Sequence, residues 1–207
     1  MFNKKELWEN IHKKNEILWL TRSKTKSVLR YHNITIEKNK EKQKTIMEIG
    51  IGFGNTIKKL SKYYNVIAVD ISQIALNRVS KIAKTYLTED LSLIKHNSVD
   101  WVMCHLVFQH CDDEMVKCIL NNVLNVLKVD GFFSFQFADL PNKNVNFDEN
   151  YKYALEKGIM HFRSLEKMKQ IINECGGKII SISPPIVWPN SYNITWYIIK
   201  CNKYNDK

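Results

Sequence analysis

The sequence predicts an α/β fold: a doubly wound, seven-stranded and mostly parallel sheet with covering helices at the N-terminus. Three observations favour it. Short apolar runs alternate with helical patterns from Thr45 onward, one strand runs directly into glycines, and the next strand ends on an acidic residue. Such alternation implies parallel strands with right-handed crossovers. We expect one globular unit with a helical extension at 1–44 and the sheet domain at 45–207.

The extension is basic and amphipathic. It contains 12 Lys and Arg against 5 Glu, and so holds +7 of the net charge of +10. Its apolar side chains recur at helical spacing, which predicts a helix laid on the domain. These side chains are Leu7, Trp8, Ile11, Leu18 and Trp19. A second short helix is expected over 24–31 and a polar loop over 37–44.

Seven strands are expected in the sheet domain, at 45–49, 66–70, 85–87, 100–106, 131–137, 178–183 and 195–201. The last two form a hairpin-like pair that brings in one antiparallel strand. Residues 139–163 read as a long connection with one helical turn. The three prolines within 183–193 exclude regular structure there.

Three helices between these strands have recognisable caps. Ser72 is expected to cap a helix with Ala75, Val79 and Ile82 on one face. Asp112 or Asp113 is expected to cap a helix that runs to residue 127. Ser164 is expected to cap a helix that stops at two glycines, 176 and 177.

The bulk composition excludes several classes of protein. No apolar run reaches the roughly 18 residues that a membrane span needs, and the N-terminus lacks the apolar core of a signal peptide, so we expect a cytoplasmic protein. The cysteines form no CxxC pair, so neither a disulfide framework nor a metal site is expected. Small buried side chains are predicted for Cys104, Cys118, Cys175 and Cys201, and Cys111 is the exception because it lies beside the candidate base His110.

The positive charge raises the question of a nucleic-acid partner. The chain has 27 Lys and only 4 Arg, whereas specific phosphate and base recognition favours the bidentate arginine fork. We therefore expect a small-molecule partner rather than a nucleic acid, with no membrane partner.

The strongest local signal is the segment 47–55, MEIGIGFGN. A strand that includes Glu48 runs into Gly50, Gly52 and Gly54, which permit a tight turn and close approach to a ligand. Asp70 ends the next strand, where a carboxylate can accept hydrogen bonds from the ribose hydroxyls of an adenosine ligand. A dinucleotide turn reads GxGxxG, but here the third glycine comes one place early.

An acidic residue followed by GxGxG resembles motif I of the class I S-adenosylmethionine-dependent methyltransferases. The likeness is close over 45–137, and among its members the chain is most similar to bacterial enzymes that act on sugars or other small metabolites. A second stretch, 97–137, resembles the family's fourth strand, helix and fifth strand. It departs from the family pattern at Asp130, which replaces the usual proline. Its matching positions are Asp100, Val102, Leu106, His110, Leu127, Lys128 and Gly131.

The resemblance implies S-adenosylmethionine as cofactor and S-adenosylhomocysteine as product. It assigns Glu48, Gly50 and Gly52 to the methionine side, Asp70 to the ribose and Ile71 to the adenine, and it places Gly54 in the cofactor site as well. Either Glu89 or Asp90 would contact the adenine amino group, with solvated surface charge as the alternative for both. His105 and Leu106 would line the other side of the cofactor.

A general base for an oxygen acceptor is expected from His110, which follows the fourth strand. The alternative is a histidine that only packs at the start of the next helix. Weaker candidates are Gln109, His105 and Cys111, and His161 in the long connection could reach a cleft.

The acceptor is predicted partly from absences. Enzymes that methylate the amino groups of nucleobases typically carry an (N/D)PP(Y/F) segment after the fourth strand, and here that place reads HLVFQH. The Pro-Cys nucleophile that cytosine C5 methyltransferases need is not present either. We expect O-methylation of a sugar or related polar metabolite. The alternatives are a methyltransferase acting on RNA or protein, suggested by the basic extension, and a non-catalytic cofactor-binding protein. Aromatic residues of 1–44 and 139–163 could cover the ligand, although for Trp8 the apolar face of a helix is favoured.

Overall fold

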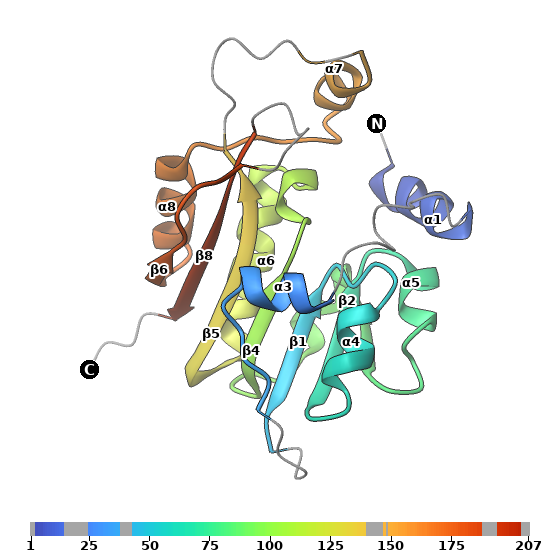
Figure 1. Cartoon of the computed structure of the whole chain (residues 1–207), viewed down its shortest axis with the longest axis vertical. Helices are drawn as coiled ribbons and strands as arrows, with labels where there is room; N and C mark the ends of the chain where they lie inside the picture. The colour runs from blue at the N-terminus through green and yellow to red at the C-terminus, as the bar shows by residue number, and fades with distance from the viewer. Residues whose placement is uncertain are drawn as a thin grey trace.

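The structure, a computed structural model, describes residues 3–14, 25–37, 43–139, 147, 149–187 and 194–203. A central sheet separates two layers of helices (Figure 1). The strand order is β3-β2-β1-β4-β5-β8-β6, so successive strands are added on one side of β1 up to β3 and on the other side from β4 onward. The predicted fold class is therefore confirmed. In such sheets, ligands bind beyond the carboxyl ends of the strands where this side changes, between β1 and β4.

All seven predicted strands are present. The parallel ones are β1 (Thr45–Ile49), β2 (Asn65–Asp70), β3 (Lys84–Leu87), β4 (Val99–Cys104) and β5 (Leu127–Ala138). The strand β8 (Thr195–Lys203) lies antiparallel between β5 and β6 (Gly177–Ile182). The central strands are apolar along their length because helices cover both faces.

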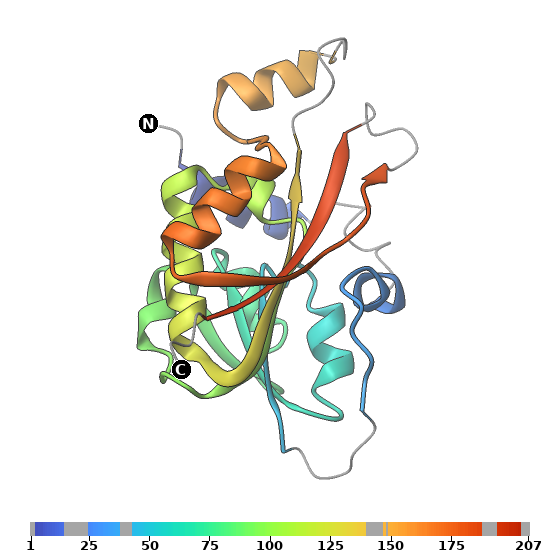
Figure 2. The same cartoon turned by 90° about the vertical axis from the view of Figure 1, so that its left-hand side faces the viewer.

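Helices occupy both faces of the sheet, as Figure 2 shows. On one face lie α3 (Thr25–Tyr31), α4 (Asn55–Leu60) and α5 (Gln73–Asn77), and on the other α6 (Asp113–Val126) and α8 (Leu165–Glu174). The predicted caps are confirmed, since the side chains of Ser72, Asp112 and Ser164 accept hydrogen bonds from backbone N–H groups in the first turns of α5, α6 and α8.

Two helices lie beyond the strand ends, α1 (Lys4–Lys14) and α7 (Glu149–Glu156) (Figure 1). The Glu9 carboxylate of α1 accepts hydrogen bonds from the Gln73 backbone N–H at 2.7 Å and the Ser72 hydroxyl at 3.0 Å. Arg78 donates to the His12 carbonyl oxygen at 2.9 Å. Thus α1 is tied to the start and end of α5. The predicted helical residues Leu18 and Trp19 lie outside the described residues.

Several predicted boundaries were wrong. A two-residue strand, β7 (Ile186–Val187), pairs with β8 inside the proline-containing stretch, because the pairing uses residues that follow Pro185. The helix α5 ends at Asn77, so Val79 and Ile82 lie beyond it, and Ile82 is 44% exposed. The helix α7 is longer than the single turn expected.

The strand β4 ends at Cys104, two residues before the predicted end. Leu106 has φ +58°, which takes the chain out of the extended conformation. The cysteines also differ from expectation: Cys118 is exposed on the solvent side of α6 and Cys175 is half-buried, whereas the other three are buried. No described helix is long and apolar enough to cross a membrane.

Candidate active site

A cavity opens at the carboxyl ends of β1, β2 and β4, and Lys4, Trp8 and His12 of α1 line it from above. The sheet contributes the turn after β1, the end of β2 and the loop after β4. The structure brings together here most of the residues that the sequence singled out. These are Glu48, Gly50, Gly52, Asp70, Ile71, His105, Leu106 and His110, with Cys111 beside them.

The glycine turn has the backbone shape that the sequence predicts. Gly50 and Gly52 have φ +75° and +53°, a region that side chains disfavour. A Cβ at Gly50 would overlap Val107, whereas the space beside Gly52 is open. Gly54 serves another purpose and does not line the cavity: it begins α4 with φ +69° and packs against Val79. Gly54 therefore supports the packing of α4, and its contact with the cofactor stays a prediction.

Asp70 ends β2 with its carboxylate buried. One oxygen accepts from the Ser72 N–H at 3.0 Å, and the other from the Gly52 N–H at 3.3 Å. Burial raises the pKa of Asp70 to about 6, and the backbone hydrogen bonds oppose that rise. These bonds fix the carboxylate at the cavity wall, with lone pairs left for a ligand.

Glu48 lies in β1 one residue before the strand ends and is only 5% exposed. Its Oε2 atom has no hydrogen-bond partner among the described residues. Burial raises its pKa to about 8, opposed by a hydrogen bond with Thr56. A cation in the cavity would supply the charge partner that this buried carboxyl group lacks.

Glu89 and Asp90 do not line the cavity. They lie in the 3₁₀ helix η1 (Thr88–Leu93), where Glu89 binds the Lys5 ammonium group at 3.0 Å. The residue just before them, Thr88, lines the cavity instead. The chain turns into η1 directly after β3, which places Thr88 at the cavity wall, and a contact of Glu89 or Asp90 with the adenine stays a prediction.

His110 lies in the short 3₁₀ helix η2 (Phe108–His110). Its Nδ1 lies 2.9 Å from the Ile159 carbonyl oxygen, and because a carbonyl only accepts, Nδ1 carries the proton. Its Nε2 is 3.3 Å from the Gln109 amide nitrogen. Burial lowers the pKa of His110 to about 4. His161 does not line the cavity, and its Nε2 instead donates to the Gly158 carbonyl oxygen at 2.9 Å.

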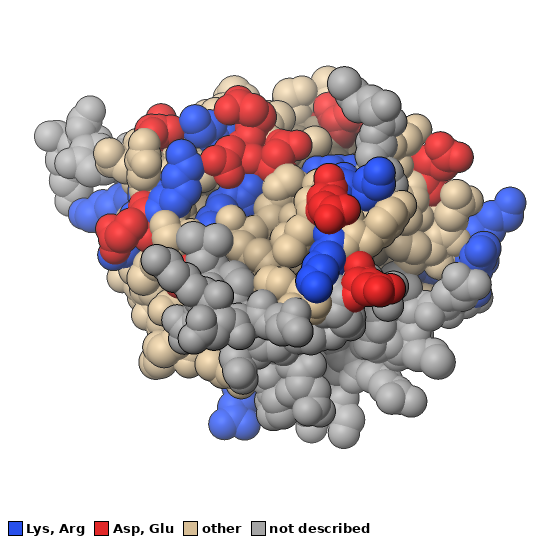
Figure 3. All heavy atoms as spheres, turned by 90° about the horizontal axis from the view of Figure 1, so that it is seen from above, with Lys and Arg blue, Asp and Glu red and all other residues tan. Residues whose placement is uncertain are grey.

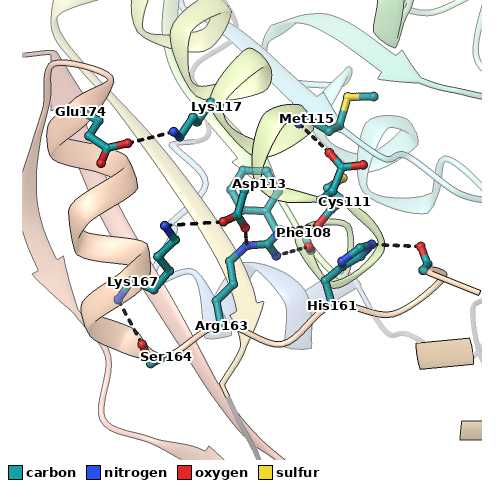
Figure 4. Close-up of polar contacts among 12 residues, drawn as sticks. Phe108, Cys111, Asp113, Met115, Lys117, His161, Arg163, Ser164, Lys167 and Glu174 are labelled. Carbon is teal, nitrogen blue, oxygen red and sulfur yellow. Dashed lines mark hydrogen bonds and ion pairs between the residues drawn. The ribbon is translucent and has the colours of Figure 1, made fainter. Parts of the chain in front are cut away.

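Sequence reasoning missed the residue that holds this loop. The Arg163 guanidinium, 4% exposed, bonds the Asp113 carboxylate at 2.7 Å and the Phe108 carbonyl oxygen at 3.0 Å (Figure 4). It also donates to the Cys111 carbonyl oxygen. Arg163 thus holds the backbone on both sides of His110 against the start of α6. Only its position next to the Ser164 cap could have drawn attention to it.

Sequence reasoning also missed His32, which follows α3 and contacts His105, and it underrated Trp8, whose ring lines the cavity. No group of three His, Cys, Asp or Glu in the described ranges lies close enough to hold a metal ion.

The sequence from 47 to 135 matches a family model described as "Methyltransferase domain". Comparison with curated proteins finds no match. Among solved structures, a methyltransferase of Thermotoga maritima, described as a possible histamine N-methyltransferase, is 17% identical. The alignment covers 96% of this chain and 99% of that one, with a TM-score of 0.68.

Two further structures share the fold. Phosphoethanolamine N-methyltransferase 2 of Haemonchus contortus, solved with S-adenosylhomocysteine, is 15% identical over 87% of this chain, with a TM-score of 0.65. This chain covers 52% of it, about half its length. Geranyl diphosphate C-methyltransferase of Streptomyces coelicolor is 10% identical, with a TM-score of 0.64. That alignment covers 93% of this chain and 82% of the other.

The sheet order and the glycine turn define a doubly wound α/β fold, and residues 47–135 within it match the methyltransferase-domain model. Over this segment and in its fold, the chain is similar to the class I S-adenosylmethionine-dependent methyltransferases. Solved neighbours contain S-adenosylmethionine or S-adenosylhomocysteine, which supports S-adenosylmethionine as the cofactor.

Proposed function

We propose that the protein methylates a small polar metabolite, at a hydroxyl oxygen of a sugar or a related compound. One observation carries the proposal. A single cavity is lined both by the glycine turn with Glu48 and Asp70 and by the histidines His105 and His110. The first group suits an adenosyl cofactor, and the second can hold and deprotonate a hydroxyl.

The residues fit the cofactor. Asp70 would accept hydrogen bonds from the ribose hydroxyls, Ile71 would pack on the adenine, and the backbone at Gly52 leaves open space for the methionine moiety. Glu48 favours an ammonium group there over a pyrophosphate. The bound cofactor supplies a methyl group on a sulfonium, and the chain contributes mainly alignment of the acceptor with it.

His110 is the proposed general base. Its Nδ1 proton is held by the Ile159 carbonyl oxygen, which leaves Nε2 as the basic nitrogen. Burial keeps the ring neutral at neutral pH, so Nε2 can accept the hydroxyl proton once the acceptor displaces the Gln109 amide. The alternative is that His110 only packs the loop against Trp8.

The extension 1–44 is proposed as a cap over the cavity rather than a nucleic-acid surface. Three described lysines of this segment are paired with acids: Lys4 with Asp112 at 3.6 Å, Lys5 with Glu89 at 3.0 Å and Lys44 with Glu37 at 2.8 Å. Figure 3 looks down on the side where α1 and α7 lie, and its coloured residues mix acidic and basic side chains. Such mixing supports a small-molecule partner over RNA.

The proposal is tested by measuring which class of molecule receives the methyl group. Labelled S-adenosylmethionine is incubated with the protein and a protein-free metabolite extract, and separately with cellular RNA and protein. We expect label in a small molecule. Label only in RNA or protein would favour the alternative acceptors, and cofactor binding without any product would favour a non-catalytic protein. His110→Ala should lower the single-turnover rate by about 10²–10⁴-fold with unchanged cofactor affinity. A loss below about tenfold would remove His110 as the base.

A further inference from the structure

Three buried polar residues form a chain that ends in the cavity. The Oγ atom of Ser134 lies 2.7 Å from Nδ1 of His32, and Nε2 of His32 lies 3.1 Å from Nδ1 of His105. Ser134 and His32 are 0% and 1% exposed. His105 lines the cavity, and the described residues make no hydrogen bond to its Nε2. One nitrogen of the chain is therefore left for a ligand.

The sheet explains why these groups meet. Side chains alternate along β5, so Phe133, Phe135 and Phe137 enter the core beneath α6 and α8, while Ser134 and Gln136 face the side that α3 covers. The parallel pairing of Cys104 with Phe135 brings the next residues of each segment, His105 and Gln136, to the same level. The buried Oε1 atom of Gln136 also lacks a partner among the described residues.

We propose that His105 is a specificity residue that binds an uncharged hydroxyl of the acceptor, with His32 and Ser134 holding its ring in place. The proposal rests on the methyltransferase function above and narrows its substrate to neutral hydroxyl compounds. A hydroxyl that neighbours the methylated one, as in a sugar, would bind here while His110 serves the reacting oxygen.

The chain suits a hydroxyl because it can run in either direction. If Ser134 donates to His32 and His32 donates to His105, Nε2 of His105 carries the proton and donates to the ligand. If every bond reverses, Nε2 accepts instead. A hydroxyl group can both donate and accept, whereas a phosphate at neutral pH mainly accepts and an ammonium group only donates.

Charge points to the same class of ligand. Burial lowers the pKa of His105 to about 4, and it lowers the pKa of His32 well below its usual value. Both rings are therefore neutral at neutral pH and offer no charge to an anion or a cation. Two structural neighbours are described with charged substrates, phosphomonomethylethanolamine and geranyl diphosphate, so this chain would differ from them in substrate charge.

The experiment uses the full chain, labelled S-adenosylmethionine and a metabolite extract separated by ion exchange into neutral, anionic and cationic fractions. We expect wild-type protein to form labelled product from the neutral fraction. Product from a charged fraction alone would overturn the inference. Product from no fraction would contradict the proposed function itself, and the inference would fall with it.

Variants then test the residues. The neutral fraction is first diluted until the acceptor concentration limits the rate. Under that condition His105→Leu should form product about tenfold or more slowly than wild type, because one hydrogen bond to the acceptor is lost. His105→Gln, which retains a polar group, should recover part of that loss. His32→Gln, which can still hydrogen-bond His105, should lose less than His32→Leu. S-adenosylhomocysteine affinity should stay unchanged in the two His32 variants, because His32 does not line the cavity.

The matched control is His96→Gln, an exposed histidine on the loop before β4 that should keep the wild-type rate. At saturating acceptor, the rate of His105→Leu should approach that of wild type, which separates lost acceptor binding from damaged catalysis. A His105→Leu variant that matches wild type in diluted neutral fraction would overturn the assignment.

Discussion

The indole ring of Trp8 packs edge-on against the imidazole ring of His110, with ring centroids 4.9 Å apart. This contact joins the N-terminal helix to the loop after β4 across the cavity. The apolar periodicity of α1 predicted a helix face that rests on the domain. The structure adds that this face rests on the proposed base, so the helix helps to set the environment of His110.

Trp8→Ala should raise the pKa of His110. Burial is the main cause of its low value of about 4, and removing the indole admits water to the ring. We expect a rise of roughly one unit, comparable to the usual spread among protein histidines. Histidine NMR titration of the cofactor-free protein measures it. Trp8→Phe, which keeps a ring in place, is the control, and an unchanged pKa in Trp8→Ala would show that other groups bury His110.

Glu48 should make the cofactor-free protein less stable as pH rises. Its folded-state pKa is raised from 4.5 to about 8, so between these values the folded chain holds a proton that the unfolded chain has lost. The free energy of unfolding therefore falls with rising pH across this window.

Glu48→Gln keeps the shape of the side chain but cannot titrate. Its melting temperature should fall less than that of wild type between pH 5 and pH 8. Asp70, whose pKa is raised in the same direction, is present in both proteins, so the difference between them isolates Glu48. Parallel curves for the two proteins would mean that Glu48 is ionised in the folded chain.

Asp70→Ala should weaken S-adenosylhomocysteine binding by about 1–3 kcal/mol, because the ribose hydroxyls would lose a charged acceptor. Calorimetry measures the change. The exposed carboxylate Asp130, which does not line the cavity, gives a matched control, and Asp130→Ala should bind as wild type does. Equal affinities for Asp70→Ala and wild type would remove Asp70 from the cofactor site.

Arg163→Met should destabilise the protein by about 1.5–3 kcal/mol, the range for hydrogen bonds to a charged group. It would leave the Phe108 and Cys111 carbonyl oxygens without their donor and loosen the loop of His110. Denaturant unfolding measures the loss. Lys167→Met is the control, since its exposed pair with Asp113 at 3.7 Å should contribute no more than about 1 kcal/mol. Equal losses in the two variants would contradict a special role for Arg163.

The strand pattern and the glycine turn could be predicted because local sequence governs them. Central strands buried on both faces must be apolar, and a turn with positive φ at Gly50 and Gly52 requires glycine. Asp70 follows from the same logic, since it ends the strand beside that turn. The caps Ser72, Asp112 and Ser164 are likewise set by their immediate neighbours.

Long-range contacts could not be predicted. Arg163 reaches Phe108 across 55 positions of sequence, and His32 reaches Ser134 across 102. No local period marks either contact. The place of Thr88 at the cavity wall could not be predicted for a related reason, because whether Thr88 or Glu89 faces the cavity depends on how η1 turns after β3.

Calorimetric titration of the purified chain with S-adenosylhomocysteine and with NAD tests the central claim most directly. The open backbone at Gly52, the buried Asp70 and the unpartnered Oε2 of Glu48 predict that S-adenosylhomocysteine binds at one site per chain and that NAD gives no heat of binding. Tight binding of NAD with no response to S-adenosylhomocysteine would contradict the account.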